Sequence, residues 1–275
     1  MSYYKNILIC GGDKRQVYMA KLMKSRGVKV STFALNKENE ITLSDINKFD
    51  VVILPVPVSK DGIHLNSPFV SYKIKLEDIL NLIDKTQIVL GGMCKGLGDN
   101  VIDYYNNESF QMQNAIPTAE GALQFAMENT DITINKSHCV VLGFGRIGKV
   151  LSLMLKNMGA FVTVCARNPK DIALAKVLGF DTLNIFELQN VADKFDIFFN
   201  TVPKIVADST VLEKVKDSAL LIELASKPYG IDMVTAEKLG KNVIVASALP
   251  GKVAPKTSGK ILCDVIMDIL TGLEV

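Results

Sequence analysis

Three glycines in the middle of the chain have the spacing of a phosphate-binding turn. Gly143, Gly145 and Gly148 follow the apolar run CVVL, and apolar residues recur at helical spacing beyond them. In a strand-turn-helix unit the first glycine permits the tight turn, the second lets the backbone approach a pyrophosphate, and the third lets helix and strand pack closely. The amides and dipole of the helix N-terminus favour an anion. The spacing predicts a dinucleotide site; the alternative is a glycine-rich turn that only packs.

The next predicted strand ends at Ala166, and Arg167 follows it. An NAD site usually carries an acidic residue here, which binds the ribose 2′-hydroxyl. No carboxylate is adjacent, whereas a guanidinium matches a 2′-phosphate in charge and in forked geometry. The sequence therefore favours NADP, with Asn168 and Lys170 able to assist. The alternative is a solvated arginine, with NAD held by other groups.

Two later strand ends join the same site if the sheet is doubly wound, because ligands bind at the carboxyl ends of such strands. Residues 200–203 (NTVP) would line the adenosine side, and residues 223–226 (ELAS) would lie nearer the nicotinamide. The residues expected to bind the cofactor are Gly143, Gly145, Arg146, Ile147, Gly148, Ala166, Arg167, Asn168, Thr201, Val202, Pro203, Leu224 and Ala225.

The elements that position these residues alternate along the chain. The runs ILIC, VKVSTFAL, VVILPV and QIVLGG predict strands in the first half, and CVVLG, FVTVC, DIFFNTV, ALLIELA and NVIVASA predict strands in the second. Residues at helical spacing lie between them, for example Val17, Ala20 and Met23. Such alternation is typical of parallel sheets with crossover helices. We expect two Rossmann-like α/β domains, of which the C-terminal one is a doubly wound dinucleotide-binding fold.

The expected division of the chain has an N-terminal domain for substrate or partner (1–116), a linking helix and turn (117–137), an NADP-binding domain (138–255) and a C-terminal helix packing back on the first domain (256–275). Pro117 suits the first turn of the linking helix, and Thr118 suits its cap. Pro250 and Pro255 predict that LPGKVAPKTSG (249–259) is a stiff loop.

The composition, 48% hydrophobic and 22% charged, is typical of a soluble globular protein. A net charge of +2 does not indicate nucleic-acid or membrane binding. The five scattered cysteines lack metal-ligand spacing, so we expect buried reduced thiols and no metal. No signal peptide or spanning run is recognisable, which predicts a cytoplasmic protein.

Further motifs carry a resemblance over almost the whole chain: ICGGDKRQ (9–16), VILPVPVSKDG (52–62), AIPTAEGAL (115–123), VVLGFGRIGK (140–149), FNTVPKIV (199–206), LIELASKPYGID (221–232) and LPGKVAPKTSGKIL (249–262). The C-terminal half resembles the cofactor domain of D-2-hydroxyacid dehydrogenases and S-adenosylhomocysteine hydrolases. The whole chain resembles the family of the dipicolinate synthase A subunit from spore-forming bacteria.

This resemblance implies an NADP-dependent oxidation of dihydrodipicolinate to dipicolinate during sporulation, in the mother-cell cytoplasm. It also implies, as partner, the flavoprotein-like B subunit of dipicolinate synthase, and a small dicarboxylate as substrate; it leaves a homo-oligomer open. D-2-hydroxyacid dehydrogenases need an arginine and a histidine. Ser226 stands at the arginine position and Gly251 or Lys252 at the histidine position, so that activity is the less favoured alternative. The other alternative is that the protein is a non-catalytic NADP-binding subunit.

A planar dicarboxylate must be held in place by cations and hydrogen-bond donors. The substrate-binding candidates are Ser59, Gly92, Lys252, Lys256, Thr257 and Ser258, and the catalytic candidates are Lys252, Glu120 and Thr118. Thr257 and Ser258 would offer the free amides of a helix start, Gly92 a bare strand-end amide, and Glu120 a proton acceptor.

Each of these candidates has a structural alternative. The lysines could be solvated, Thr118 a cap, and Glu120 structural. The turn GGDKRQ resembles a second anion site, unless Asp13 and Arg15 pair with each other. His64, in the loop after VPVSKDG, is expected to be a surface residue.

Overall fold

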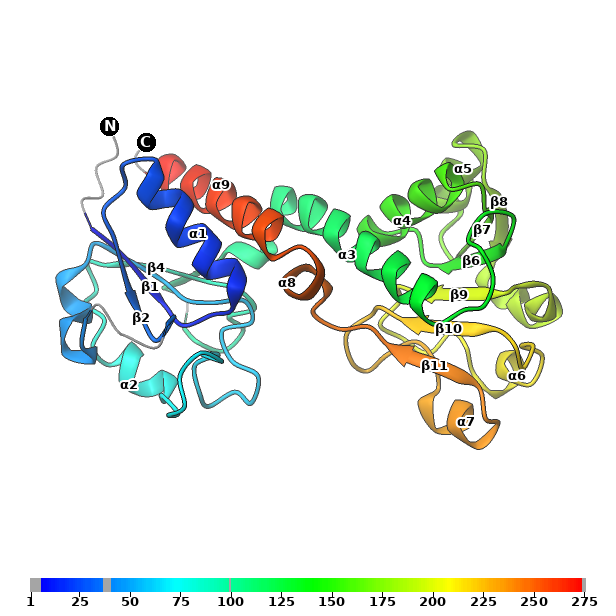
Figure 1. Ribbon diagram of the computed structural model, residues 1–275, viewed down its shortest axis with the longest axis horizontal. Helices are drawn as coiled ribbons and strands as arrows, with labels where there is room; N and C mark the ends of the chain where they lie inside the picture. Colours follow the sequence, from blue (N-terminus) through cyan, green and yellow to red (C-terminus); the bar gives the residue numbers. More distant parts are fainter. Residues whose placement is uncertain (1–5, 37–40, 99, 274–275) are drawn as a thin grey trace. The chain divides into compact units, whose positions relative to one another are not determined.

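The computed structural model describes residues 6–36, 41–98 and 100–273, and the chain divides into two compact units (Figure 1). Unit 1 comprises Met1–Asn114 and Ala254–Val275, and unit 2 is Ala115–Val253. Helix α3 (Glu108–Glu128) begins in unit 1 and ends in unit 2. Each unit has its own parallel sheet, which confirms the predicted fold class.

The described strands of unit 1 form a parallel sheet in the order β2-β1-β3-β4-β5. Its strands are β1 (Ile7–Cys10), β2 (Val30–Phe33), β3 (Val51–Ile53), β4 (Ile88–Gly91) and β5 (Val101–Asp103). Its helices are α1 (Lys14–Ser25), η1 (Leu43–Lys48), α2 (Leu76–Leu80), η2 (Tyr104–Asn106) and α9 (Pro255–Leu273).

Both faces of this sheet are buried, as a parallel sheet requires. Alternate strand residues point to opposite faces. Ile7 and Ile9 pack in the cluster that contains residues of α1 and α9, whereas Leu8 and Cys10 pack in the cluster that contains Ile46 of η1. Helices α1 and α9 lie side by side (Figure 1).

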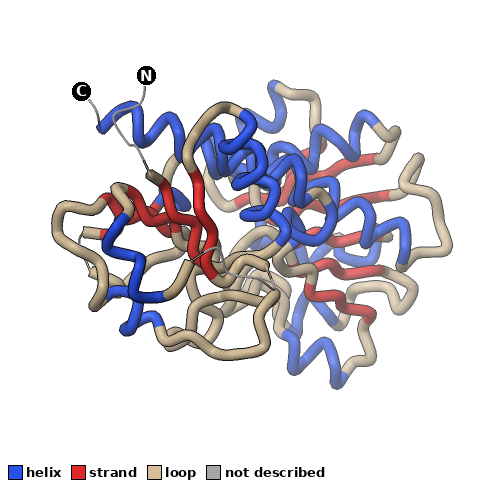
Figure 2. Tube along the Cα trace, turned by 60° about the vertical axis from the view of Figure 1, so that its left-hand side comes forward, coloured by secondary structure: helices blue, strands red, loops and turns tan. Residues whose placement is uncertain are grey.

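The described strands of unit 2 form a parallel sheet in the order β11-β10-β9-β6-β7-β8. Figure 2 shows these strands side by side, flanked by helices. The strands are β6 (His138–Leu142), β7 (Phe161–Ala166), β8 (Asp181–Asn184), β9 (Ile197–Asn200), β10 (Leu220–Glu223) and β11 (Asn242–Val245). The helices are α4 (Arg146–Asn157), α5 (Pro169–Val177), η3 (Ile185–Asn190), η4 (Ala192–Lys194), α6 (Ser209–Leu212), α7 (Met233–Lys238) and α8 (Leu249–Val253). This strand order is that of a doubly wound dinucleotide-binding fold.

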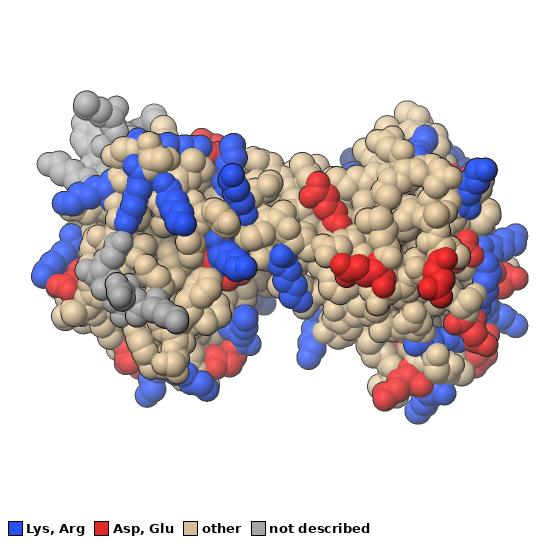
Figure 3. Space-filling view, in the orientation of Figure 1, with Lys and Arg blue, Asp and Glu red and all other residues tan. Residues whose placement is uncertain are grey.

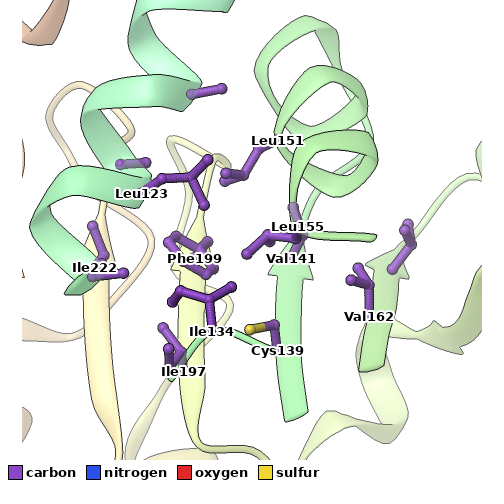
Figure 4. Close-up of a cluster of buried hydrophobic side chains, with 14 of the residues drawn as sticks. Leu123, Ile134, Cys139, Val141, Leu151, Leu155, Val162, Ile197, Phe199 and Ile222 are labelled. Atoms are coloured by element: carbon purple, nitrogen blue, oxygen red, sulfur yellow. The ribbon is translucent and has the colours of Figure 1, made fainter. Parts of the chain in front are cut away.

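The core of unit 2 also has two layers. Val141 of β6 and Phe199 of β9 pack against Leu123 of α3 and Leu151 of α4 (Figure 4). Val140 and neighbouring strand residues fill the other face, against η3, α6 and α7. The central position of β6 between these layers holds the glycine turn in a fixed place.

The linking helix begins earlier than the sequence suggests. Asn107 Oδ1 accepts a hydrogen bond from Phe110 N (3.0 Å), so the helix has its cap there. Pro117 lies inside α3, and Thr118 is buried in the same helix. The predictions of a helix start at Pro117 and a cap at Thr118 are therefore wrong. A good residue for a helix start does not fix one when the preceding residues are also helical.

The segment LPGKVAPKTSG is helical rather than a loop. It contains α8 and the first turn of α9, which begins at Pro255. Pro250 is the second residue of α8. Both prolines thus lie in first turns, where the fixed φ of proline suits a helix and its missing N–H is not needed. The prediction of a stiff loop is wrong because these prolines start helices.

Two edge strands, β5 and β8, were not predicted. Their residues are mostly half-buried, so they lack the apolar runs that mark the central strands. The five cysteines are free and buried, as predicted. Burial raises the pKa of Cys94 and Cys165 to about 12. Within the described part of the chain no helix is long and apolar enough to cross a membrane.

Candidate functional site: a dinucleotide cavity in unit 2

The turn between β6 and α4 has the backbone that its glycines predict. Gly143 has a φ of +93°, and a Cβ on it would lie 2.6 Å from Thr201 Oγ1. A Cβ on Gly148 would collide with the carbonyl oxygen of Gly143, whereas a Cβ on Gly145 would meet nothing within 4 Å. Two of the glycines are needed for packing, and the third leaves its backbone open to approach.

The N-terminus of α4 is open to an anion. Gly145 is its N-cap and has no side chain, so the N-cap residue itself supplies no side-chain hydrogen bond to this 12-residue helix. These amides and the helix dipole can receive a phosphate.

The corresponding N-terminus of α1 in unit 1 is closed. The Asp13 carboxylate accepts from Arg15 N (2.9 Å), and Gln16 Oε1 accepts from Asp13 N (3.0 Å). The buried Arg15 guanidinium donates to the Asp13 carboxylate and to the carbonyl oxygen of Val56. The chain's own carboxylate therefore fills the second anion site that GGDKRQ resembles.

A cavity of about 560 Å³ lies at the carboxyl ends of β6, β7 and β9. Ligands bind at this edge in doubly wound folds. The predicted cofactor residues that line it are Gly143, Gly145, Ala166, Arg167, Asn168, Thr201, Val202 and Pro203. Three segments that are far apart in the sequence thus meet at one cavity.

Other predicted cofactor residues do not line this cavity. Arg146, Ile147 and Gly148 form the first turn of α4, and Leu224 and Ala225 follow β10. Ala225 N donates to Glu223 Oε1 (2.8 Å), so this amide is bonded within the protein.

The cavity also contains residues that the sequence did not suggest: Phe144, Asp171, Ile185, Phe186, Lys204, Ile205 and Val206. Residues 204–206 continue the segment after β9, so the strand-end rule could have found them. Ile185 and Phe186 follow β8, which was not predicted. Phe186 is 73% exposed and Ile205 48%, and exposed apolar side chains in a cavity are typical of a binding surface.

Three charged side chains line the cavity: Arg167, Lys204 and Asp171. Within the described part of the chain, Arg167 and Lys204 form no ion pair or side-chain hydrogen bond. Asn168 Oδ1 accepts from Lys170 N (2.9 Å) and so caps α5. The two cations are available to a ligand, whereas the Asn168 side chain already has a structural role.

This combination fits a nicotinamide dinucleotide. The open N-terminus of α4 would hold the pyrophosphate, Arg167 and Lys204 offer cations, and the exposed apolar residues offer a surface for a flat ring. Gly145 is the residue whose backbone would approach the pyrophosphate most closely.

The predicted substrate residues Lys252 and Lys256 do not share a loop. Lys252 is exposed on α8 in unit 2, and Lys256 is exposed in the first turn of α9 in unit 1. Lys256 and Thr257 line a groove of about 580 Å³ between α1 and α9. Lys and Arg side chains gather over these two helices on the face shown in Figure 3.

Backbone hydrogen bonds exclude two of the expected free amides. Ser258 N donates to Ala254 O (2.9 Å), and Gly92 N donates to Pro55 O (3.1 Å). Ser258 and Gly92 are also buried. The prediction that their bare amides receive a ligand is wrong because the fold uses both.

The remaining substrate and catalytic candidates are Ser59, Thr118 and Glu120. Ser59 Oγ donates to Asp61 Oδ1 (3.0 Å), and Asp61 Oδ2 also pairs with His64 Nδ1 (2.8 Å). Thr118 is buried in α3, and Glu120 is exposed on the same helix.

Two protein families match the chain, one for each unit. Residues 6–112 match the N-terminal domain of the dipicolinate synthase A subunit. Residues 117–255 match the S-adenosyl-L-homocysteine hydrolase, NAD binding domain. The cavity therefore lies in a domain whose family binds a nicotinamide dinucleotide.

Individual relatives match over nearly the full length. The dipicolinate synthase A subunit of Bacillus subtilis is 28% identical over 286 residues, covering 98% of this chain and 96% of the relative. The crystal structure of the dipicolinate synthase A subunit from Bacillus halodurans has a TM-score of 0.88 at 29% identity, covering 97% of each chain.

A transhydrogenase from Sinorhizobium meliloti has a TM-score of 0.69 at 13% identity, covering 96% of this chain and 92% of that one, and shares the fold alone. The two family matches and the full-length relatives agree on both units. The chain is similar to the dipicolinate synthase A subunit over nearly its full length, and its second unit belongs to the family of the S-adenosyl-L-homocysteine hydrolase, NAD binding domain.

Proposed function

We propose that the protein is the A subunit of dipicolinate synthase, an NADP-dependent oxidoreductase that converts dihydrodipicolinate to dipicolinate. The observation that carries this proposal is the similarity of both units, over nearly the full length, to the corresponding protein of Bacillus subtilis. The proposed setting is the mother cell of a sporulating bacterium, and the proposed partner is the flavoprotein-like B subunit.

The reaction asks little of the protein's acid–base groups. Dihydrodipicolinate and NADP⁺ give dipicolinate, NADPH and a proton, with the bound dinucleotide accepting the hydride. The aromatic product drives the step, so a weak base or water suffices as proton acceptor. The protein's main task is to hold the substrate ring still in a reactive position.

The cofactor is proposed to be NADP. Arg167 directly follows β7 and lines the cavity without an ion-pair partner among the described residues. Its planar guanidinium suits a 2′-phosphate. Asp171 lines the same cavity, so NAD, which offers a 2′-hydroxyl, is the competing ligand.

The proposed substrate residues are those whose polar groups are exposed. In unit 2, Lys252 is proposed to bind a substrate carboxylate. In unit 1, Lys256 and Thr257, which line the groove between α1 and α9, are proposed as carboxylate-binding residues in their own right. Glu120, exposed on α3, is the proposed proton acceptor. Ser59 is not among the proposed substrate residues, because its hydroxyl already donates to Asp61 Oδ1 (3.0 Å).

The test is turnover. Purified protein is mixed with NADP⁺ and freshly generated dihydrodipicolinate, with and without the partner protein, and dipicolinate is followed by its ultraviolet absorbance. Turnover with this chain alone assigns catalysis to it, and turnover only with the partner present indicates a shared site or a non-catalytic cofactor-binding role. Absence of turnover in both mixtures contradicts the proposed reaction.

A second test uses the variant Gly145→Val at the glycine turn. The new side chain would enter the open space beside the α4 N-terminus and meet nothing within 4 Å of its Cβ in the protein. The variant should fold normally and lose turnover. Undiminished turnover would show that the dinucleotide does not bind at this turn.

A further inference from the structure

A fully buried carboxylate lies next to the segment that lines the dinucleotide cavity. Glu223, the last residue of β10, is 0% exposed. Its Oε1 accepts from Asn200 Nδ2 (2.7 Å) and Ala225 N (2.8 Å). Its Oε2 accepts from Gly230 N (2.9 Å) and Ile231 N (3.0 Å). A buried carboxylate is tolerated only with such donors, so each oxygen has a defined pair of partners.

Asn200 connects this carboxylate to the cavity. It is also 0% exposed, and it ends β9. Its Oδ1 accepts from Val202 N (3.1 Å), and its Nδ2 donates to Val202 O (3.0 Å) as well as to Glu223. The bond to Glu223 admits only one orientation of the Asn200 amide. Glu223 thereby fixes both backbone groups of Val202, which lines the cavity.

A second connection passes through Gly230. Its N–H binds Glu223, and its carbonyl oxygen accepts from Val206 N (2.8 Å) and Ala207 N (3.0 Å). Val206 also lines the cavity. A Cβ on Gly230 would lie 2.8 Å from Asn200 Oδ1 and would also collide with Val202 O. The buried carboxylate therefore fixes both ends of the segment from Val202 to Val206.

We propose that Glu223 is a positioning residue of the dinucleotide site: it touches no cofactor, but it sets the backbone of residues 202–206 against which the cofactor binds. The competing explanation is that Glu223 only satisfies buried amides and stabilises the fold. The proposal rests on the dinucleotide site and not on the proposed reaction, so it is tested by binding, without substrate.

The test variant is Glu223→Gln in the full-length protein. Glutamine has the same shape, but its NH₂ donates, so two N–H groups of the network would face a donor. We expect the Kd values for NADP⁺ and for NAD⁺ to rise together by about tenfold or more, because a shared backbone surface is displaced. Calorimetry at a temperature where the variant is folded measures both.

The matched control is Asp196→Asn, beside the opposite end of β9. Asp196 accepts from His138 N (2.8 Å) and from Lys216 Nζ (2.9 Å), and it does not line the cavity. This variant should lose thermal stability while both Kd values stay within about twofold of the parent value. Unchanged Kd values in Glu223→Gln as well would overturn the proposal and leave Glu223 a structural role.

A second variant covers the case in which Glu223→Gln does not fold. Gly230→Ala leaves the carboxylate in place and pushes a methyl group against Asn200 and Val202. This variant should weaken the binding of both NADP⁺ and NAD⁺. It should also speed amide hydrogen exchange at Val202 and Val206, but not at Val141 of β6. Normal cofactor binding in this variant, or exchange accelerated equally throughout unit 2, would contradict the proposal.

Discussion

Arg167 is the residue on which we propose that the cofactor preference depends. Its position after β7 is the one where a doubly wound fold meets the 2′ position of the adenosine ribose. The guanidinium lines the cavity together with Lys204 and Asp171. Under this proposal, the selectivity between NADP and NAD is a balance between two cations that attract a 2′-phosphate and one carboxylate that repels it.

Arg167→Asp should lower the affinity for NADP⁺ by about ten- to a hundredfold, because a hydrogen-bonded charge pair contributes about 1.5–3 kcal/mol. The affinity for NAD⁺ should be unchanged or improved. Titration of both cofactors by calorimetry measures the change. Lys214→Asp, an equal change of charge at an exposed residue outside the cavity, is the control. Equal NADP⁺ affinity in both variants would remove Arg167 from the 2′-phosphate site.

At the scale of the element, one glycine decides how closely helices α1 and α9 pack. A Cβ on Gly259 of α9 would lie 2.6 Å from Arg15 O and 2.7 Å from Tyr18 Cβ. The glycine thus allows the two helices to approach closely. Gly259 of α9 thus approaches the backbone of Arg15, whose side chain pairs with Asp13 at the start of α1.

Gly259→Ala should destabilise the protein by up to about 2 kcal/mol, because overpacking costs about 1–3 kcal/mol and the better helix propensity of alanine offsets about 1 kcal/mol. Thermal unfolding followed by circular dichroism measures this. Gly272→Ala, on the same helix with nothing within 4 Å of its new Cβ, should be neutral or slightly stabilising. Equal melting temperatures for the two variants would show that the helices separate without cost.

The sequence predicted those elements whose signals are local. The central strands are continuous apolar runs, and the turn from Gly143 to Gly148 has an unambiguous spacing, so both were found. The bonds of Asn200 and Glu223 were not, because they join residues whose neighbourhood exists only after β9 and β10 pair. The prolines at 117, 250 and 255 led to wrong predictions, because proline inside a helix, at a helix start and in a loop cannot be distinguished by type alone.

At the scale of the whole molecule, the two units differ in the number of chain segments that they contain. Unit 2 is one continuous segment with its own two core layers. Unit 1 needs two segments, because α9 supplies Ile261, Leu262, Val265 and Ile266 to its core. The dinucleotide cavity lies wholly within the continuous unit.

A fragment of residues 115–253 should therefore fold alone and bind the dinucleotide with an affinity similar to that of the full chain. A fragment of residues 1–114 should not fold, because each lost core side chain of α9 contributes about 1.5–3 kcal/mol and domain stability is only about 5–15 kcal/mol. Circular dichroism and cofactor titration of both fragments test this. Cooperative unfolding of the 1–114 fragment would show that α9 is dispensable.

The return of the chain to unit 1 also sets the order in which a ribosome makes the protein. Helix α9 is translated after all of unit 2, so unit 2 is complete while one face of the unit 1 sheet still lacks its cover. Domains fold as units during synthesis, and here the second unit in the sequence is the first that can finish. Until α9 has left the ribosome, buried residues such as Met19 and Met23 stay partly uncovered, and the nascent chain presents this apolar face to chaperones.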